Sequence, residues 1–168
     1  MQINLQQIGT INSPFCQLEN MPVQPKGARE VYATIEVKKE YEEGLKDLDG
    51  FNFIYLIYYF HEVKEHKLQV VPFMDKTKTK RGVFSTRTPM HPNSIGLSIV
   101  ELIQIEGNRV VIKGVDILNG TPLLDIKPYI ENFDKVDKKS TSGWMNATLE
   151  EVNNKKSDNR FIKKGVTA

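Results

Sequence analysis

The sequence predicts a mainly β protein with minor α content, folded as a small β-barrel or another closed mixed sheet. Six or seven segments have either the alternation or the β-branched and aromatic composition of strands. Only residues 38–48 have apolar side chains at a helical spacing. Because strands and helices do not alternate regularly, a doubly wound parallel sheet is disfavoured.

The predicted strands are separated by recognisable turns. Residues 30–37 (EVYATIEV) place Val, Ala and Ile side chains on one face, which is typical of a half-buried strand. Residues 95–106 and 109–115 flank Gly107-Asn108, which predicts a two-residue hairpin turn. The other predicted strands are residues 3–11, 51–63, 67–73 and 115–126.

The helix predicted from the apolar spacing spans residues 38–48. Tyr41, Leu45 and Leu48 fall on one face, with charged side chains on the other. Gly44 weakens the helix by about 1 kcal/mol relative to alanine. Asp49-Gly50 then ends it and begins the aromatic strand.

The composition is typical of one globular domain. The chain has 168 residues, of which 39% are hydrophobic and 26% charged, and this excludes a wholly disordered chain. Its net charge is only +2, so a nucleic-acid surface would have to come from local clustering of cations. The single cysteine, Cys16, cannot form an internal disulfide bond.

No targeting or membrane segment is expected. The most apolar stretch, residues 51–60, is about half the length that spans a bilayer. The first residues lack the basic and apolar regions of a signal peptide. We therefore expect a soluble, cytoplasmic protein without a membrane partner.

The composition changes near residue 133. Residues 1–132 carry the strand pattern and are predicted to form the barrel domain. Residues 133–168 are polar and rich in lysine, and a short helix is predicted within residues 144–152. We expect this extension to be partly helical and partly mobile.

One segment contains cations and lacks carboxylates. From Lys76 to Val100 there is no Asp or Glu, in a chain whose acids and bases otherwise nearly balance. An anionic ligand, such as a phosphate backbone, would explain this pattern. A solvated loop explains it equally well on charge alone. The cations of this segment are Lys76, Lys78, Lys80, Arg81 and Arg87.

Two further clusters have side chains suited to a nucleoside. At the end of the aromatic strand, His61-Glu62 follows Phe60, and a carboxylate there can accept hydrogen bonds from ribose hydroxyls. The alternative is a strand end that frays into solvent. The segment 119–122 (NGTP) is a turn whose exposed N–H groups can hold a small ligand, although such turns are common.

Familiar catalytic and metal signatures are absent from the sequence. There is no P-loop, no Gly-x-Gly-x-x-Gly, no Gly-x-Ser-x-Gly and no paired cysteine. His61 and His66 are five residues apart, so an extended strand would place them on opposite faces. We therefore expect no metal site.

Taken in order, five motifs resemble the TrmO (YaeB-like) family of S-adenosylmethionine-dependent tRNA methyltransferases. Members of that family methylate the N6 nitrogen of threonylcarbamoyl-adenosine beside the anticodon. The similarity covers residues 7–129. The motifs are IGTINSPF (8–15), PVQPKG (22–27), FH (60–61), GVFSTRTPMHPNSIGLS (82–98) and DILNGTPLLDIKPY (116–129).

The resemblance implies a small, non-Rossmann β-barrel methyltransferase that acts as a homodimer on tRNA. It also implies that S-adenosyl-L-methionine lies near the subunit interface. The residues that match the cofactor contacts of the family are Pro25, Lys26, Gly27, His61, Glu62, Arg87, Leu97, Asn119, Gly120, Thr121 and Pro122.

Roles in substrate binding and catalysis are assigned as hypotheses. Asp125 and Tyr129 are the candidates for assisting the N6 nitrogen, and Asn93 for orienting the cofactor or the modified base. Phosphate contacts are assigned to Lys76, Lys78, Lys80 and Arg81, with Lys163 and Lys164 as a second set.

The sequence departs from the family pattern at three positions. It has His91-Pro92-Asn93-Ser94 where the family has Arg-Pro-Asn-Pro, Glu62 where Gln is frequent, and Asn119 where many bacterial members have Asp. Two alternatives therefore stay open: a methyltransferase of the same fold with another substrate, and a non-catalytic β-barrel that binds RNA.

Overall fold

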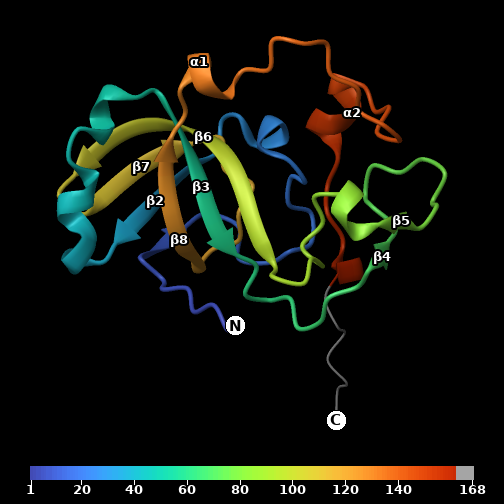
Figure 1. The fold of residues 1–168 in the computed structure, drawn as a ribbon, viewed down its shortest axis with the longest axis horizontal. Coiled ribbons are helices and arrows are strands. Elements are labelled where there is room, and N and C mark those ends of the chain that lie inside the picture. Colours follow the sequence, from blue (N-terminus) through green and yellow to red (C-terminus); the bar gives the residue numbers. More distant parts are fainter. Residues whose placement is uncertain (162–168) are drawn as a thin grey trace.

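Six antiparallel strands close into a barrel in the computed structural model, which describes residues 1–161 (Figure 1). The strand order around the barrel is β1-β2-β7-β6-β3-β8. This confirms the predicted fold class. The strands are β1 (Gly9–Asn12), β2 (Tyr32–Val37), β3 (Phe53–Tyr59), β6 (Ile95–Glu106), β7 (Arg109–Lys113) and β8 (Thr121–Pro128).

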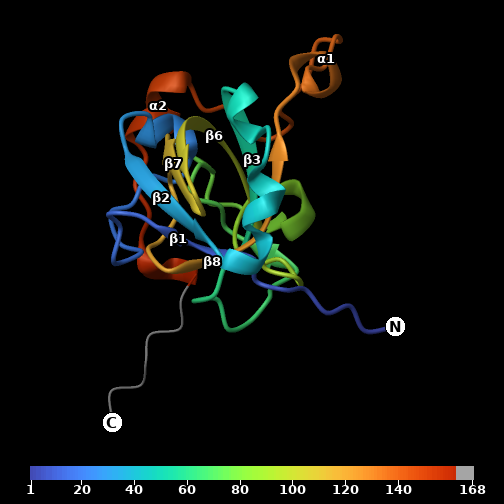
Figure 2. The same ribbon diagram turned by 90° about the vertical axis from the view of Figure 1, so that its left-hand side faces the viewer.

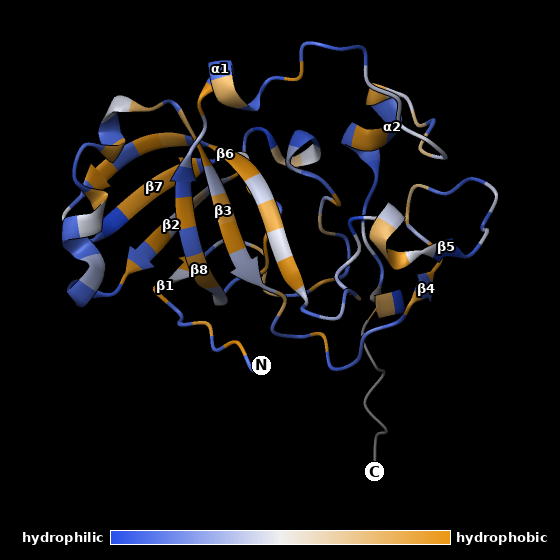
Figure 3. Ribbon diagram, in the orientation of Figure 1, coloured by the Kyte–Doolittle hydropathy of each residue, from blue (hydrophilic) through white to orange (hydrophobic). Residues whose placement is uncertain are grey.

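The alternation in the strand sequences sets which side chains form the core. In β2, Ala33, Ile35 and Val37 are buried inside the barrel, whereas Tyr32 and Glu36 are exposed. The same alternation recurs in β3, β6 and β7, and Figure 3 shows apolar residues distributed along all of these strands. Burial of apolar surface is the main favourable contribution to folding, so this core holds the barrel closed.

The predicted hairpin at Gly107-Asn108 is confirmed. Glu106 pairs with Arg109, and Gly107 has a φ of +58°, which glycine adopts without strain. The Asn108 side chain donates to the Val37 carbonyl at 2.6 Å, and the Val37 N–H donates to the Asn108 carbonyl. The turn is thereby tied to β2.

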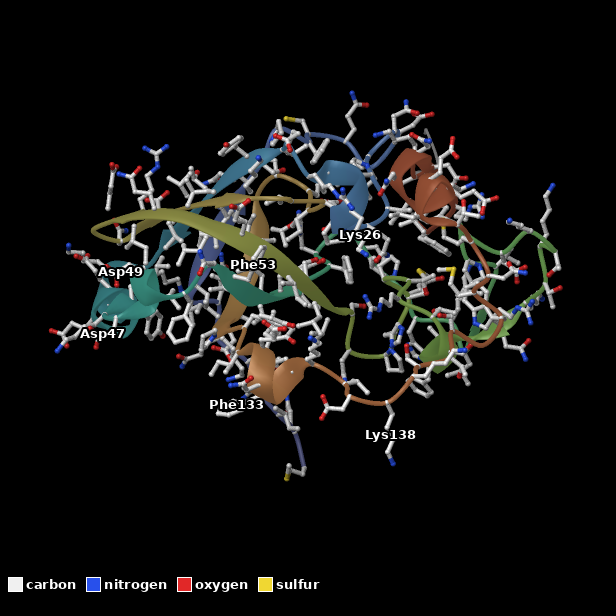
Figure 4. The ribbon with its side chains drawn as sticks, turned by 90° about the horizontal axis from the view of Figure 1, so that it is seen from above. Lys26, Asp47, Asp49, Phe53, Phe133 and Lys138 are labelled. Atoms are coloured by element: carbon white, nitrogen blue, oxygen red, sulfur yellow. The ribbon has the colours of Figure 1, made fainter. Side chains whose placement is uncertain are left out.

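The predicted α-helix at residues 38–48 is wrong. The segment forms two 3₁₀-helices, η2 (Lys39–Leu45) and η3 (Leu48–Gly50). Asp47 lies between them with a φ of +64°, which interrupts any continuous helix. Leu45 and Leu48 are nevertheless buried, and the segment covers the end of the barrel where Figure 4 labels Asp47 and Asp49.

Several predicted strands are shorter or displaced. The first begins only at Gly9, and the strand expected at residues 67–73 is reduced to β4 (Gln69–Val70), because Pro72 cannot donate to a ladder. The last strand begins after the turn at Gly120, whose φ is +77°, and continues to Pro128.

A smaller lobe lies beside the barrel (Figures 1 and 2). Its strand β4 pairs with β5 (Arg81–Gly82), and Val70, Val83 and Met90 form a separate apolar cluster. The other elements outside the barrel are η1 (Pro25–Ala28), η4 (Val83–Ser85), α1 (Glu131–Asp134), α2 (Leu149–Asn154) and η5 (Asn159–Phe161).

The described part of the C-terminal extension docks on this lobe. The helix predicted at residues 144–152 is displaced to α2, because Thr148 and Glu151 form a capping box that sets its start. After α2, Lys156 pairs with Pro22, and Ser157 exchanges backbone hydrogen bonds with Met21 and Asn20. Lys163 and Lys164 lie outside the described residues.

Among residues 1–161, no helix combines the length and the apolar character needed to cross a membrane.

Gly96, near the start of β6, gives a direct test of how tightly the barrel interior is packed. A Cβ atom at this position would lie 2.2 Å from the ring of buried Tyr58. We expect Gly96→Ala to lower the free energy of unfolding by about 1–3 kcal/mol, as overpacking does. Gly44→Ala is the control, because nothing lies within 4 Å of its Cβ. Equal stabilities in denaturant titrations would contradict this packing.

Candidate functional site

A cavity of about 810 Å³ lies between the barrel and the smaller lobe. Its walls come from the start of β6, the end of β3, the loop that carries η1, the segment around η4, and the C-terminal extension. The lining is mainly apolar and aromatic, with a few polar and charged groups. This is the usual character of a site for a small molecule or cofactor.

The cavity follows a free edge of β6. β6 has 12 residues and β7 only 5, so β7 pairs with β6 from Glu101 onward and leaves the first half of β6 without a partner on that side. Phe60 N–H donates to the Ser94 carbonyl, and Leu102 N–H donates to the Asn52 carbonyl. The even-numbered residues of β6 therefore direct their backbone groups toward β3. By the antiparallel alternation, the N–H and C=O of Leu97 point to the cavity side.

His61 has an unused polar atom at the cavity wall. Its Nδ1 is buried and has no hydrogen-bond partner, while its Nε2 lies 3.6 Å from Oε1 of Glu62. Leaving such an atom unpaired costs about 1–3 kcal/mol. A ligand that supplies the missing partner would recover that energy.

Asp116 contributes a half-buried carboxyl group to the same cavity. Its Oδ1 accepts a hydrogen bond from Ser98 Oγ at 3.1 Å, and Ser98 Oγ shares another with the Tyr58 hydroxyl at 3.1 Å. Burial raises the pKa of Asp116 to about 6, against the lowering effect of the Ser98 hydrogen bond. Burial likewise raises the pKa of Tyr58, which stays protonated.

Two of the predicted phosphate-binding cations are already paired. Arg81 Nε donates to Oδ2 of Asp75 at 2.6 Å, and Lys76 Nζ lies 2.7 Å from Oε1 of Glu151. Hydrogen bonds from Arg81 and Thr77 lower the pKa of Asp75 to about 2. Residues 76–100 contain no carboxylate, but the fold places the carboxylates of Asp75 and Glu151 against two of their cations.

The C-terminal extension forms part of the cavity wall. Trp144 lines the cavity, donates from Nε1 to the Ser85 carbonyl at 2.9 Å, and has the Arg81 guanidinium 5.5 Å from its ring centroid. Phe161 packs against Phe73 with ring centroids 4.9 Å apart. The extension therefore packs on the smaller lobe at two places, beside η4 and at Phe73.

Comparison with known proteins identifies the family of the chain. Residues 10–135 match the model of the tRNA-methyltransferase O N-terminal domain. A probable S-adenosyl-L-methionine-binding protein of Pyrococcus abyssi is 44% identical over 155 residues, which are 92% of this chain and 83% of that protein. The chain belongs to the TrmO family.

More distant relatives agree with this assignment. A rat tRNA (adenine(37)-N6)-methyltransferase is 36% identical over 133 residues, which are 76% of this chain and 31% of that protein. The crystal structure of TrmO from Pseudomonas aeruginosa superposes with a TM-score of 0.69 at 32% identity, covering 83% of this chain. The chain spans 62% of that TrmO chain. The resemblance predicted from the five sequence motifs is confirmed.

The structure brings together part of the cofactor set expected for a TrmO protein. The predicted cofactor-binding residues that line the cavity are Pro25, His61, Glu62, Arg87, Leu97 and Thr121. They come from segments that are far apart in the sequence.

The rest of that set lies outside the cavity. Gly27 lets α2 pack on the loop, since a Cβ there would lie 2.9 Å from the Asn153 carbonyl, and neighbouring Lys26, labelled in Figure 4, is exposed. Asn119 Oδ1 accepts from the Ser13 N–H at 3.1 Å. The turn residues Gly120 and Pro122 also do not line the cavity.

The candidate catalytic residues face away from the cavity. Asp125 and Tyr129 lie on the outside of β8, where Asp125 pairs with Lys127 at 2.9 Å and the ring of Tyr129 lies 5.8 Å from that of Tyr55. Asn93 is exposed and does not line the cavity, whereas neighbouring His91 does. None of the three is therefore positioned at this cavity within one copy of the chain.

Sequence reasoning missed Asp116, Ser98 and Trp144. Asp116 and Ser98 stood inside quoted family motifs, but nothing in their spacing indicated that they meet. Trp144 is the single tryptophan of the chain, in a polar extension that has no family motif. Only the fold brings these residues to one cavity.

An apolar face lies on the outside of β3 and β6. We call it the outer face. Phe53, which Figure 4 labels, is exposed on β3, and Leu97 is 60% exposed on β6. The exposed large apolar residues of the outer face are Phe53, Tyr59, Ile95, Leu97 and Ile99.

Proposed function

We propose that this chain transfers a methyl group from S-adenosyl-L-methionine to the N6 nitrogen of adenosine 37 in tRNA, and that the substrate is its threonylcarbamoyl form. The observation that carries the proposal is the convergence of family-motif residues from separate loops on one cavity beside β6. Membership of the TrmO family and the activity for which the rat relative is named support the reaction type.

The cavity suits this cofactor. Its volume of about 810 Å³ lies within the range of cofactor sites. The backbone of Leu97 offers a donor and an acceptor at a free strand edge, which matches the edge of an adenine. His61 Nδ1 and Glu62 supply partners for polar groups of the nucleoside. When bound, the cofactor supplies an electrophilic methyl group on a sulfonium.

The rim of the cavity suits a nucleobase that has left its stack. An enzyme that modifies a base in RNA must extract it into a pocket. Phe84 lines the cavity, is 78% exposed, and packs edge-on against His91 at a centroid distance of 5.8 Å. An exposed ring at a cavity mouth can stack on a base.

Phosphate contacts are assigned to the part of the basic segment that lacks acidic partners. Lys78 and Lys80 have no ion-pair partner among residues 1–161 and lie on the loop between Asp75 and β5. Lys76 and Arg81 are already neutralised and instead fix that loop. Their contribution to RNA binding is therefore expected to be smaller.

A homodimer through the outer face completes the proposal. Exposed contiguous apolar side chains on a strand face are typical of interaction surfaces. Leu97 belongs to both regions, because its backbone borders the cavity and its side chain lies on the outer face. A second copy would therefore cover the cavity edge and bring Asp125 and Tyr129 to the interface. Any role of these two residues in the reaction depends on that second copy.

The substrate is tested by single-turnover methyl transfer from labelled S-adenosyl-L-methionine to tRNA with and without the threonylcarbamoyl group. We expect transfer to the modified tRNA to be faster by about tenfold or more, because a site built for polar groups is left unpaired without them. Equal rates would contradict the threonylcarbamoyl preference. Binding of tRNA without binding of the cofactor in calorimetry would instead favour the non-catalytic alternative.

The phosphate contacts are tested by the double variant Lys78→Ala/Lys80→Ala. Each lost contact reduces the slope of log Kd against log salt by about 0.7–0.9, so the pair should reduce it by about 1.5. Lys38→Ala/Lys46→Ala, at the opposite end of the barrel, is the matched control and should leave the slope unchanged. If both double variants have the wild-type slope, this loop is not part of the RNA footprint.

The dimer is tested by sedimentation equilibrium of Leu97→Glu. A charge in an apolar interface is strongly unfavourable, so we expect the dissociation constant to rise by about 100-fold or more. Leu68→Glu is the control, because Leu68 is 65% exposed and lies on the smaller lobe. A wild-type monomer, or equal effects of both substitutions, would rule out the outer face as the interface.

A further inference from the structure

Asp116 forms part of the cavity wall at the end of the barrel core. It lies in the connection between β7 and β8, between Val115 and Ile117, whose side chains are buried in the core. Asp116 itself is half-buried and lines the cavity.

The carboxyl group is held in one position. Ser98 Oγ donates to it at 3.1 Å, and Tyr58, 4% exposed, shares a hydrogen bond with the same hydroxyl. Tyr58 is in turn packed against Gly96, where even a methyl group would overlap its ring. A chain of contacts through β3 and β6 thus fixes Asp116 against the free edge of β6.

The other ionisable groups of the cavity wall are in different settings. Glu62 has half of its side chain exposed and lies beside His61, and Asp158 is bound by Arg160 at 2.6 Å. The remaining ones are Arg87 and His91, and His91 Nε2 bonds to the Thr86 carbonyl at 3.1 Å. Among the described residues, Asp116 is the carboxyl group of this wall that has no basic side chain as an ion-pair partner, and it is half-buried.

We propose that Asp116 is the catalytic base that accepts the N6 proton during methyl transfer, an inference that rests on the function proposed above. The N6–H bond breaks and its proton passes to a carboxylate oxygen of Asp116. The electron pair left on N6 forms the new bond to the methyl carbon, and the pair of the methyl–sulfur bond stays on the sulfur. The products are the N6-methylated base, a neutral thioether and a protonated Asp116.

The chemistry of N6 explains why a base is needed. The lone pair of this nitrogen is delocalised into the purine ring and, in the threonylcarbamoyl form, into the carbamoyl carbonyl. Removal of the proton restores a nucleophilic pair. A base works best when its pKa is near the operating pH, and burial brings the pKa of Asp116 to about 6. Asp116 is then mostly ionised at neutral pH.

The test compares wild type with Asp116→Asn in single-turnover transfer to threonylcarbamoyl-modified tRNA between pH 5 and 8. In wild type we expect a rate that falls about tenfold per pH unit below about 6, as Asp116 becomes protonated. In Asp116→Asn we expect a rate about 10²–10⁴-fold lower at pH 7.5, without that inflection. Asp49→Asn, at the opposite end of the barrel, is the control and should behave like wild type.

Binding of S-adenosylhomocysteine by calorimetry provides a readout that does not depend on activity. Asp116→Asn keeps the shape and can still accept from Ser98, so we expect affinity within about threefold of wild type. Ser98→Ala removes the hydrogen bond that lowers the pKa of Asp116, and should therefore move the inflection to higher pH.

The outcomes separate the two proposals. A wild type that transfers no methyl group to any tRNA overturns the proposed function and this inference with it. A wild type that transfers, with an Asp116→Asn variant of equal rate or retained inflection, overturns only the role of Asp116, since the inflection would then belong to another group. Loss of S-adenosylhomocysteine binding in Asp116→Asn would likewise overturn it, because Asp116 would be holding the cofactor.

Discussion

The unequal lengths of β6 and β7 determine where this protein can bind a ligand. β7 ends at Lys113 and leaves the backbone of residues 95–100 without a neighbour on one side. In a closed barrel such an edge would have to be paired or covered, because unpaired buried peptide groups are unfavourable. Here it borders a cavity of about 810 Å³, so a ligand can take the position of the missing strand. The same edge carries Ser98, and through it Asp116.

The smaller lobe and the C-terminal extension give this edge an opposite wall. The lobe has little core of its own: within residues 1–161 its buried cluster consists of Val70, Val83 and Met90. It is held by contacts with residues that follow the barrel, through Trp144, the Lys76–Glu151 ion pair and the packing of Phe161 on Phe73. The part of the extension that the structure describes, residues 133–161, is therefore part of the cavity architecture.

The barrel could be predicted because its signals are local. The alternation of Ala33, Ile35 and Val37 and the turn at Gly107-Asn108 each depend on a few adjacent residues, and both occur as expected. The prediction of a helix at residues 38–48 is also wrong for a local reason. Asp47 has a left-handed backbone conformation that divides the segment, and the spacing of apolar residues does not reveal such a position.

The site could be predicted only in part, because its contacts join distant segments. Arg81 pairs with Asp75 and Lys76 with Glu151, so two cations of a segment that contains no acid are neutralised by carboxylates from outside it. The bond between Ser98 and Asp116 joins residues 18 apart, which no spacing rule relates. The family motifs identified the loops that meet at the cavity, but not which of their residues line it. In one such loop, Pro25 lines the cavity whereas Gly27 packs on α2.

A crystal structure with S-adenosylhomocysteine tests the central claim most directly, namely that the free edge of β6 forms the adenosyl site. We predict that the adenosyl group lies along residues 95–98, within hydrogen-bond distance of the Leu97 backbone and of His61 Nδ1. A ligand bound elsewhere, or no binding at a concentration that saturates other TrmO proteins, would contradict the account.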